Sequence, residues 1–530
     1  YRMKKILLVI SLILAFALSC GKSSNSHALL LNLKEEGKSY DPQLANDSTA
    51  EIVDSLIGET LIREGEDGQG VPGVAEKWEV SKDGLVWTFH LRKNAKWSNG
   101  DPITANDFRA GWLRALNPNT AAEYASKLFP IKNAEAYNKG EVKEDAVGIQ
   151  AVDNYTLKVT LGAPLPYFDS AVRLYTYLPV NTKFLKEVGD KYMTSPKDSI
   201  SSGAYVIKSW TKDSEIVFEK NPNYWNKDNI PLETVKIKFV ADEAALNAFK
   251  NNEIDITNIT TEQAKEYAND KRLRVAKDGS VWYMTYNMKN KVLANKKIRQ
   301  ALSLAVDREK LITGVLDNKG EAAYTYTTKG VGIYGVSKDF SEEAGKVFPA
   351  YNPQKAKQLL AEGLKELGLK KLPTLEMIFN TTGSNKAIAE FIQESMEKNL
   401  GIDFKVTGIT FKERLARMES KNYEIALAGF NGDYPDAVTY LERFDSKDGN
   451  NYSQYVNPKY DATLKIAKNS MDKATRVKAM IELEKMIADD MPVGLLYYRA
   501  NNKLINPRVK GIVFHPIGID YYLGKTTIGK

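Results

Sequence analysis

The chain has 530 residues, of which 27% are charged and 43% are hydrophobic, with a formal net charge of +7. Basic and acidic residues are mixed along the chain and form no basic patch, which argues against a nucleic-acid-binding protein. A single cysteine excludes an intrachain disulfide, so the fold must be stabilised by its hydrophobic cores, and this length predicts about three domains.

The first segment of the sequence is typical of a secretory signal peptide. Met3 is followed by two lysines, and an apolar run then extends from Ile6 to Leu18. That run is about 13 residues long, whereas a membrane-spanning helix needs roughly 20. We therefore predict that residues 1–19 are a signal peptide.

Cys20 follows this segment directly and is the cysteine of a stretch that resembles a bacterial lipobox, with Leu18 and Ser19 before it and Gly21 after it. The resemblance implies lipidation of Cys20 and stable membrane anchoring through two acyl chains. Residues 20–27 are then expected to be a polar tether. The alternative is an ordinary cleaved signal followed by an incidental cysteine.

Two stretches in the first third of the chain predict β-strands. An Asp83-Gly84 turn precedes Trp87, Phe89 and Leu91, which alternate with polar residues. A similar alternation recurs in residues 153–161. Because side chains of a strand point to opposite faces in turn, this period of two indicates strands with one buried face.

Helices are predicted by a different spacing later in the chain. Asn352 is a good helix cap and Pro353 suits the first helical position, and an apolar stripe follows up to Leu367. A second amphipathic stretch extends over residues 474–490. The mixture of strands and helices predicts α/β or α+β domains.

The sequence contains few residues that could carry catalysis. It has three histidines, His27, His90 and His515, and no HExxH, CxxC, P-loop or GxSxG motif. The sequence leaves open a catalytic or metal site made of carboxylates, but no spacing of its acidic residues indicates one. We therefore expect a binding protein rather than an enzyme, without a metal or other cofactor.

Several stretches of the sequence form a distinctive set in a fixed order along the chain. The longest is residues 72–112, "PGVAEKWEVSKDGLVWTFHLRKNAKWSNGDPITANDFRAGW". Others are "GAYVIKSW" from 203, "IRQALSLAVDREKLI" from 298 and "MPVGLLYYRANNKLINPRVKG" from 491. Together they resemble the family 5 solute-binding proteins of ABC importers, and most of all the oligopeptide-binding branch. The resemblance covers nearly the whole chain after the signal peptide.

The resemblance implies an α/β fold of the two-lobed periplasmic-binding-protein kind (class II type), with an additional inserted domain and a hinged ligand cleft. Lobe I would comprise residues 28–58, 182–284 and 498–530, the inserted domain residues 59–181, and lobe II residues 285–497. Trp78, Trp87, Trp97 and Trp112 would then belong to the core rather than to the ligand site.

The resemblance also gives a role to Asp433, in "AGFNGDYPDA" (428–437). In oligopeptide-binding relatives the corresponding aspartate pairs with the α-amine of the peptide, and neighbouring backbone groups bond to the peptide as a strand would. Removing one partner of a buried ion pair costs about 3 to 5 kcal/mol. Without the resemblance, an exposed acid in a turn beside Pro435 is the simpler interpretation.

Other cleft positions follow from the same comparison. On lobe II, Gly429 and Asn431 would offer backbone hydrogen bonds, and Phe430 and Phe411 would line side-chain pockets, unless these rings belong to the core. On lobe I, the stretch "YDPQLANDSTAE" would supply the facing wall, through Asn46, Ser48 and Ala50.

The sequence departs from the family where some relatives bind the carboxylate of the peptide with Lys, His and Arg. The corresponding positions here hold Leu316, Asn385 and Leu427. The cysteines that pair in such relatives are also absent, and Ser280 and Asn431 stand in their places. How the far end of a peptide is bound is therefore left open.

We predict a monomeric, lipid-anchored, extracytoplasmic subunit that delivers oligopeptides to an ABC permease and its ATPase. Another cargo of the family, such as a dipeptide, nickel chelate, haem or sugar, is an alternative. A surface lipoprotein that acts in adhesion or sensing is a second alternative, of a different class.

Overall fold

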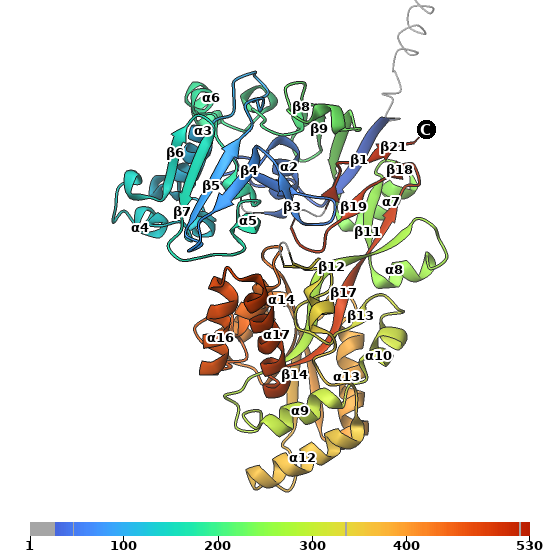
Figure 1. Cartoon of the computed structure of the whole chain (residues 1–530). Helices are drawn as coiled ribbons and strands as arrows, with labels where there is room; N and C mark the ends of the chain where they lie inside the picture. The colour runs from blue at the N-terminus through green and yellow to red at the C-terminus, as the bar shows by residue number, and fades with distance from the viewer. Residues whose placement is uncertain (1–26, 46, 334–335, 519–520, 530) are drawn as a thin grey trace, which may run out of the picture.

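The computed structural model describes residues 27–45, 47–333, 336–518 and 521–529. Its elements form an upper and a lower body, joined by long strands that run between them (Figure 1). The predicted signal peptide and Cys20 lie outside the described residues, as does Asn46. The mixed α/β class predicted from the sequence is confirmed.

The upper body contains a four-stranded sheet built from distant parts of the chain. Its order is β1 (Ala28–Leu33), β10 (Thr234–Phe239), β9 (Glu215–Lys220) and β8 (Tyr205–Thr211). β1 pairs in parallel with β10, and the other pairs are antiparallel. The chain thus leaves this sheet after β1 and returns to it only at β8.

A second four-stranded sheet in the upper body is formed by the intervening residues. Its antiparallel order is β4 (Ala75–Val80), β5 (Val86–Leu91), β7 (Thr156–Thr160) and β6 (Ile149–Asp153). The strands predicted from period-two spacing are therefore confirmed, and Gly84 of the turn has φ +72°. Trp112, on α3 (Ala105–Leu116), is fully buried and donates from Nε1 to the Tyr177 carbonyl at 2.7 Å.

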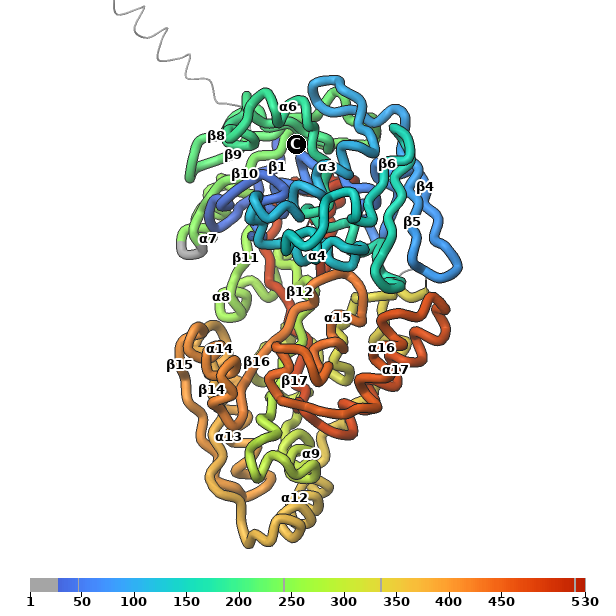
Figure 2. The backbone as a smooth tube through the Cα atoms, turned by 90° about the vertical axis from the view of Figure 1, so that its left-hand side faces the viewer, coloured from blue at the N-terminus to red at the C-terminus, as the bar shows by residue number. Residues whose placement is uncertain are grey.

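A seven-stranded sheet extends from the junction into the lower body. Its main order is β11 (Ile256–Ile259), β17 (Val493–Ile505), β12 (Leu273–Tyr286), β16 (Ile425–Asn431), β14 (Leu375–Asn380) and β15 (Phe404–Ile409). The short β13 (Glu321–Ala322) pairs with β17. β12 and β17 are the long antiparallel strands that link the two bodies (Figures 1 and 2).

Helices surround this sheet in the lower body. The longer ones are α9 (Lys296–Leu304), α12 (Pro353–Leu367), α13 (Asn385–Leu400), α14 (Phe411–Glu419), α16 (Pro458–Asn469) and α17 (Lys473–Asp490). Both predicted helices are confirmed. At the start of α12, the side chain of Asn352 accepts a hydrogen bond from the Lys355 N–H at 3.0 Å, as a helix cap should.

The remaining α-helices have between 3 and 10 residues. The helices are α2 (Ser48–Ile57), α4 (Ala134–Asn138), α5 (Phe168–Ala171), α6 (Thr182–Val188), α7 (Asp242–Lys250), α8 (Thr261–Glu266), α10 (Arg308–Lys310), α11 (Phe340–Ala344) and α15 (Val438–Leu441). Three two-stranded pairs are β2 (Ile62–Glu64) with β3 (Gly70–Pro72), β18 (Val509–Lys510) with β21 (Thr527–Ile528), and β19 (Val513–Phe514) with β20 (Tyr521–Tyr522). None of the helices in the described ranges is long and apolar enough to cross a membrane.

Two large hydrophobic cores stabilise the two bodies. The core of the upper body includes Trp87, Trp97 and Trp112, each at most 2% exposed. The core of the lower body also takes in Tyr167, whose neighbour Phe168 belongs to the upper core. The two bodies are therefore in direct contact near residues 167 and 168.

Candidate ligand-binding site

The strand β16 has one paired edge and one partly open edge. It pairs with β12 along its whole length, from Ile425 to Asn431. Its pairing with β14 involves Ile425 and Ala426 alone among the described residues. Because strand residues direct N–H and C=O groups to both edges, the stretch up to Asn431 offers backbone groups that a further strand could bind.

The presence of a glycine at position 429 is explained by the packing of this stretch against β12. It faces Trp282 of β12 in the register, and a Cβ atom at this position would meet Trp282 Cε2 at 2.6 Å. The Trp282 ring in turn stacks on Tyr497 at 6.0 Å. A glycine is therefore required for close packing of the strand against this aromatic pair.

Asp433 lies just beyond the end of β16 and is exposed. Its N–H donates to Thr439 Oγ1 at 3.0 Å, which holds the backbone of the loop. Its carboxylate forms no hydrogen bond or ion pair with any residue that the structure describes. Burial raises the pKa of Tyr124 in the upper body, and the charges of Glu51 and Asp433 add to the rise. Within the described chain, Asp433 therefore has no charged partner at contact distance, and it lies near enough to the upper body to act on Tyr124.

The loop that carries Asp433 also contacts the upper body. Tyr434 stacks on Tyr167 with the two rings nearly parallel, 4° apart, and their centroids at 5.1 Å. Next to it, Ser170 Oγ donates to the Pro435 carbonyl at 3.4 Å. These contacts place the predicted amine anchor at the junction of the two bodies.

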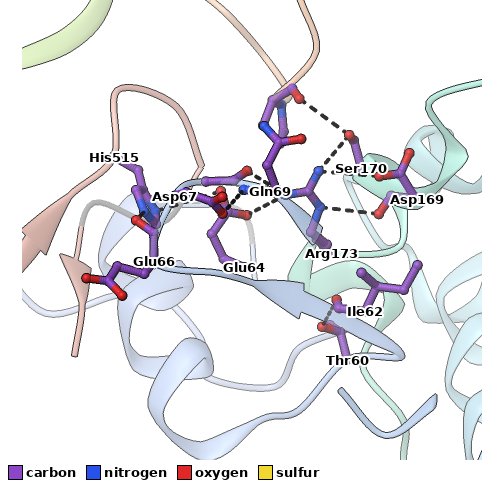
Figure 3. Close-up of polar contacts among 12 residues, drawn as sticks. Thr60, Ile62, Glu64, Glu66, Asp67, Gln69, Asp169, Ser170, Arg173 and His515 are labelled. Carbon is purple, nitrogen blue, oxygen red and sulfur yellow. Dashed lines mark hydrogen bonds and ion pairs between the residues drawn. The ribbon is translucent and has the colours of Figure 1, made fainter. Parts of the chain in front are cut away.

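A buried polar cluster supports this junction from the upper body (Figure 3). Arg173 Nη1 bonds to Glu64 Oε2 at 3.0 Å, and Nη2 bonds to Ser170 Oγ at 2.8 Å. Asp169 lies 3.6 Å from the Arg173 guanidinium and is fully buried. Burial raises the pKa of Asp169 to about 7. The buried environment of this cluster therefore disfavours the ionised form of Asp169.

The residues predicted for the facing wall lie at the start of α2. Ser48 is exposed, whereas Ala50 is buried. The Ala50 N–H donates to Asp47 Oδ1 at 2.8 Å, because Asp47 caps the helix. That N–H is already satisfied in this structure, so Ser48 is the more accessible of the two for a ligand.

The two phenylalanines predicted to line side-chain pockets are both accessible. Phe411, at the start of α14, is 55% exposed, and the Arg414 guanidinium lies over its ring at 5.3 Å. Phe430 is half-buried, with Arg443 over its ring at 4.5 Å. Neither arginine belongs to a sequence motif, so these contacts could not be predicted from the sequence.

The positions that were predicted to correspond to the cations of some relatives are all buried. Leu316 is 3% exposed, Asn385 is 5% exposed and Leu427 is fully buried. Asn385 Nδ2 donates a hydrogen bond to the Asn380 carbonyl at 3.0 Å, so this amide group already has a partner within the fold. Ser280 and Asn431 stand opposite each other on β12 and β16. None of these positions contributes a charge to the site.

Comparison with known proteins gives a family for this architecture. The model of the bacterial extracellular solute-binding proteins, family 5 Middle, matches residues 69–452. The dipeptide-binding protein DppE of Bacillus subtilis is 34% identical, over 94% of this chain and 91% of that protein. OppA of Listeria monocytogenes, solved bound to peptide, is 32% identical, over 96% of this chain and all of that one, with a TM-score of 0.71.

A third similar protein is informative about the arrangement of the two bodies. The periplasmic murein tripeptide-binding protein MppA, solved in an unliganded open form, is 28% identical over 95% of this chain and 97% of that one, with a TM-score of 0.82. The chain therefore superposes better on this open form than on the peptide-bound OppA of Listeria monocytogenes.

These matches confirm the predicted periplasmic-binding-protein fold. They also agree with the prediction of a protein that binds rather than catalyses. Among the residues that the structure describes, no group of three or more His, Cys, Asp or Glu is placed to hold a metal ion. The chain belongs to family 5 of the bacterial extracellular solute-binding proteins.

Proposed function

We propose that this chain captures oligopeptides outside the cytoplasmic membrane, through their backbone and free α-amine, and delivers them to an ABC permease. The names of similar proteins support this proposal, since they include a dipeptide-binding protein and an OppA bound to peptide. The permease and its ATPase would supply the work of transport.

The observation that carries the proposal is the partly open edge of β16, followed by the Asp433 carboxylate, which has no ion-pair partner among the described residues. A peptide that adds a strand to this edge would bond to the backbone at Gly429 and Asn431. Its α-amine would then pair with Asp433. Since every peptide has the same backbone and amine, such a site can accept many sequences.

Closure of the two bodies would complete the site. We propose that lobe I (28–58, 182–284 and 498–530) and the inserted domain (59–181) rotate towards lobe II (285–497). Ser48 and, after release from its helix cap, Ala50 would then reach the peptide from the facing wall. Burial between the lobes would strengthen the ion pair at Asp433, because the effective dielectric constant falls.

The cellular location follows from the first residues of the sequence. We propose that residues 1–19 are removed and that Cys20 carries the lipid that tethers the protein to the outer face of a bacterial membrane. A lipid anchor would keep the protein close to its permease. A Cys20→Ser variant that still fractionates with membranes would contradict this part of the proposal.

Isothermal titration calorimetry with paired peptides tests the proposed function. Peptides with a free amine should bind, and their N-acetylated forms, which cannot form the ion pair, should bind far more weakly. A second candidate, a dipeptide carrier, is favoured by the similarity to DppE. A series from dialanine to hexaalanine separates the two, since a dipeptide carrier would bind dialanine most tightly.

A further inference from the structure

Three cations of the lower body lie over aromatic rings without an acidic partner among the described residues. Arg414, Lys421 and Arg443, here called the cation cluster, form no ion pair with any acid in the described part of the chain. Asp448 and Glu419 influence the cluster at longer range, Asp448 on Arg443 and both acids on Lys421. The cluster therefore has a net positive charge that the described residues do not neutralise at contact distance.

Aromatic rings connect the members of the cluster. Arg443 lies over Phe430 at 4.5 Å and over Tyr452 at 5.8 Å. Lys421 Nζ lies over the same Tyr452 ring at 4.8 Å. Arg414 and Arg443 both act electrostatically on Tyr283, which joins the third cation to the other two. The rings supply weak cation–π attraction but no negative charge.

Arg414 is the member of the cluster whose charge loses most contact with water, because its side chain is only 5% exposed. Its Nη1 contacts the sulfur of Met418 at 3.1 Å, and its buried Nε has no hydrogen-bond partner in the described structure. Burial lowers the pKa of Arg414, and burial followed by repulsion from Arg443 lowers the pKa of Lys421. A buried guanidinium without a counter-ion destabilises the unliganded protein, so a bound anion would relieve that cost.

The cluster lies within reach of a peptide held at Asp433. Arg443 stacks on Phe430, which precedes Asp433 by three residues on the same segment. Three residues of extended chain span about 10 Å. The helix α14, which contains Arg414, lies at the end of the lower body that is nearer to the upper body (Figure 1). A short extended peptide could therefore place one end at Asp433 and an anionic group at the cluster.

We propose that the cation cluster of Arg414, Lys421 and Arg443 is a subsite for a carboxylate of the bound ligand. This inference rests on the proposed function, since it takes the ligand to be a peptide that starts at Asp433. The carboxylate is either the C-terminus of a peptide of about three residues or an acidic side chain. The subsite would replace the charge that is missing at Leu316, Asn385 and Leu427.

Calorimetry with three peptides tests this subsite. Ala-Ala-Ala carries a terminal carboxylate, its C-terminal amide carries none, and Ala-Ala-Glu-amide carries only a side-chain carboxylate. Wild-type protein should bind the amide at least tenfold more weakly than the free acid, since a hydrogen bond to a charged group of this kind has about that effect. Recovery of affinity with Ala-Ala-Glu-amide would assign the subsite to acidic side chains as well.

Substitutions within the cluster then show which residues cause the difference in affinity between the free acid and the amide. Arg443→Gln and Lys421→Gln should each reduce the difference between the free acid and the amide, whereas Arg414→Gln serves only if circular dichroism shows it to be folded. Arg417→Gln is the matched control on α14, because Arg417 already pairs with Glu376 at 3.7 Å. It should retain the full difference.

Two negative results have different meanings. If wild-type protein binds the free acid and the amide equally, or if Arg443→Gln retains the full difference, the carboxylate subsite is wrong while peptide capture stands. If no peptide with a free amine binds at all, the proposed function fails and the subsite fails with it.

Discussion

Arg476 binds both carboxylate oxygens of Asp436, with Nη1 to Oδ2 at 2.9 Å and Nη2 to Oδ1 at 2.5 Å, and neither side chain is more than 3% exposed. Asp436 lies three residues after Asp433, and Arg476 belongs to α17. The Arg476 guanidinium also lies over the Tyr167 ring at 5.2 Å. This ion pair therefore fixes the loop of Asp433 to the lower body, beside its contact with the upper body.

Breaking that pair should destabilise the fold. Arg476→Met leaves the buried Asp436 carboxylate without its counter-ion, and the free energy of unfolding should fall by about 3 to 5 kcal/mol. Urea denaturation measures the change. In the double variant Asp436→Leu with Arg476→Met, no charge is left buried, so it should recover part of the loss. A single variant as stable as wild type would refute the role given to this pair.

Gly429→Ala should lower stability through overpacking. The added methyl would meet Trp282 at 2.6 Å, and an insertion of this kind costs about 1 to 3 kcal/mol. Thermal unfolding and tryptophan fluorescence report the change. Gly449→Ala is the matched control, since nothing lies within 4 Å of its added Cβ. Equal melting temperatures for the two variants would show that Gly429 is not closely packed.

The pKa of Asp169, raised to about 7 by burial, predicts a dependence of stability on pH. An aspartate in the unfolded chain ionises near pH 4, so between about pH 4 and 7 the folded state binds more protons at this site. The contribution of Asp169 to stability is thus fully present below that window and is lost as the pH rises through it.

Asp169→Asn cannot titrate and tests this expectation. Its free energy of unfolding should fall less than that of wild type between pH 4 and pH 8, by about 1.4 kcal/mol for each unit of the pKa shift. Denaturation curves at several pH values measure the two slopes. Identical slopes would show that Asp169 is ionised in the folded protein across this range.

Asp433→Asn should weaken peptide binding by about two to three powers of ten, because it removes one partner of an ion pair that closure would bury. Calorimetry measures the affinity. Asp190→Asn, an exposed acid of the upper body with no ion pair in the described residues, is a control of matched charge. If both variants bind as wild type does, the α-amine is not anchored at Asp433.

The regular elements could be predicted from the sequence because their signals are local. The strand at Val86–Leu91 follows from alternation, and the helix at Pro353–Leu367 follows from its cap and apolar stripe. The resemblance to a family also indicated Asp433 and the two-lobed fold. These features depend on residues that are close together in the sequence or on a pattern shared by the whole family.

The open edge and the cation cluster depend on tertiary contacts and could not be predicted in this way. The free edge of β16 arises because its pairing with β14 stops at Ala426, which no local pattern encodes. Arg443 and Arg414 become notable only because folding places each over an aromatic ring and gives neither an ion-pair partner among the described residues. A charged residue in a helix or turn is otherwise most simply interpreted as part of a solvated surface.

The most direct test of peptide capture is native mass spectrometry of the protein without residues 1–19 and with Cys20→Ser, followed by acid release and sequencing of the molecules that copurify. The account predicts a heterogeneous set of short peptides with free amino termini, lost in the Asp433→Asn variant. A single non-peptide ligand, or a protein that is empty and also fails to bind added peptides, would contradict it.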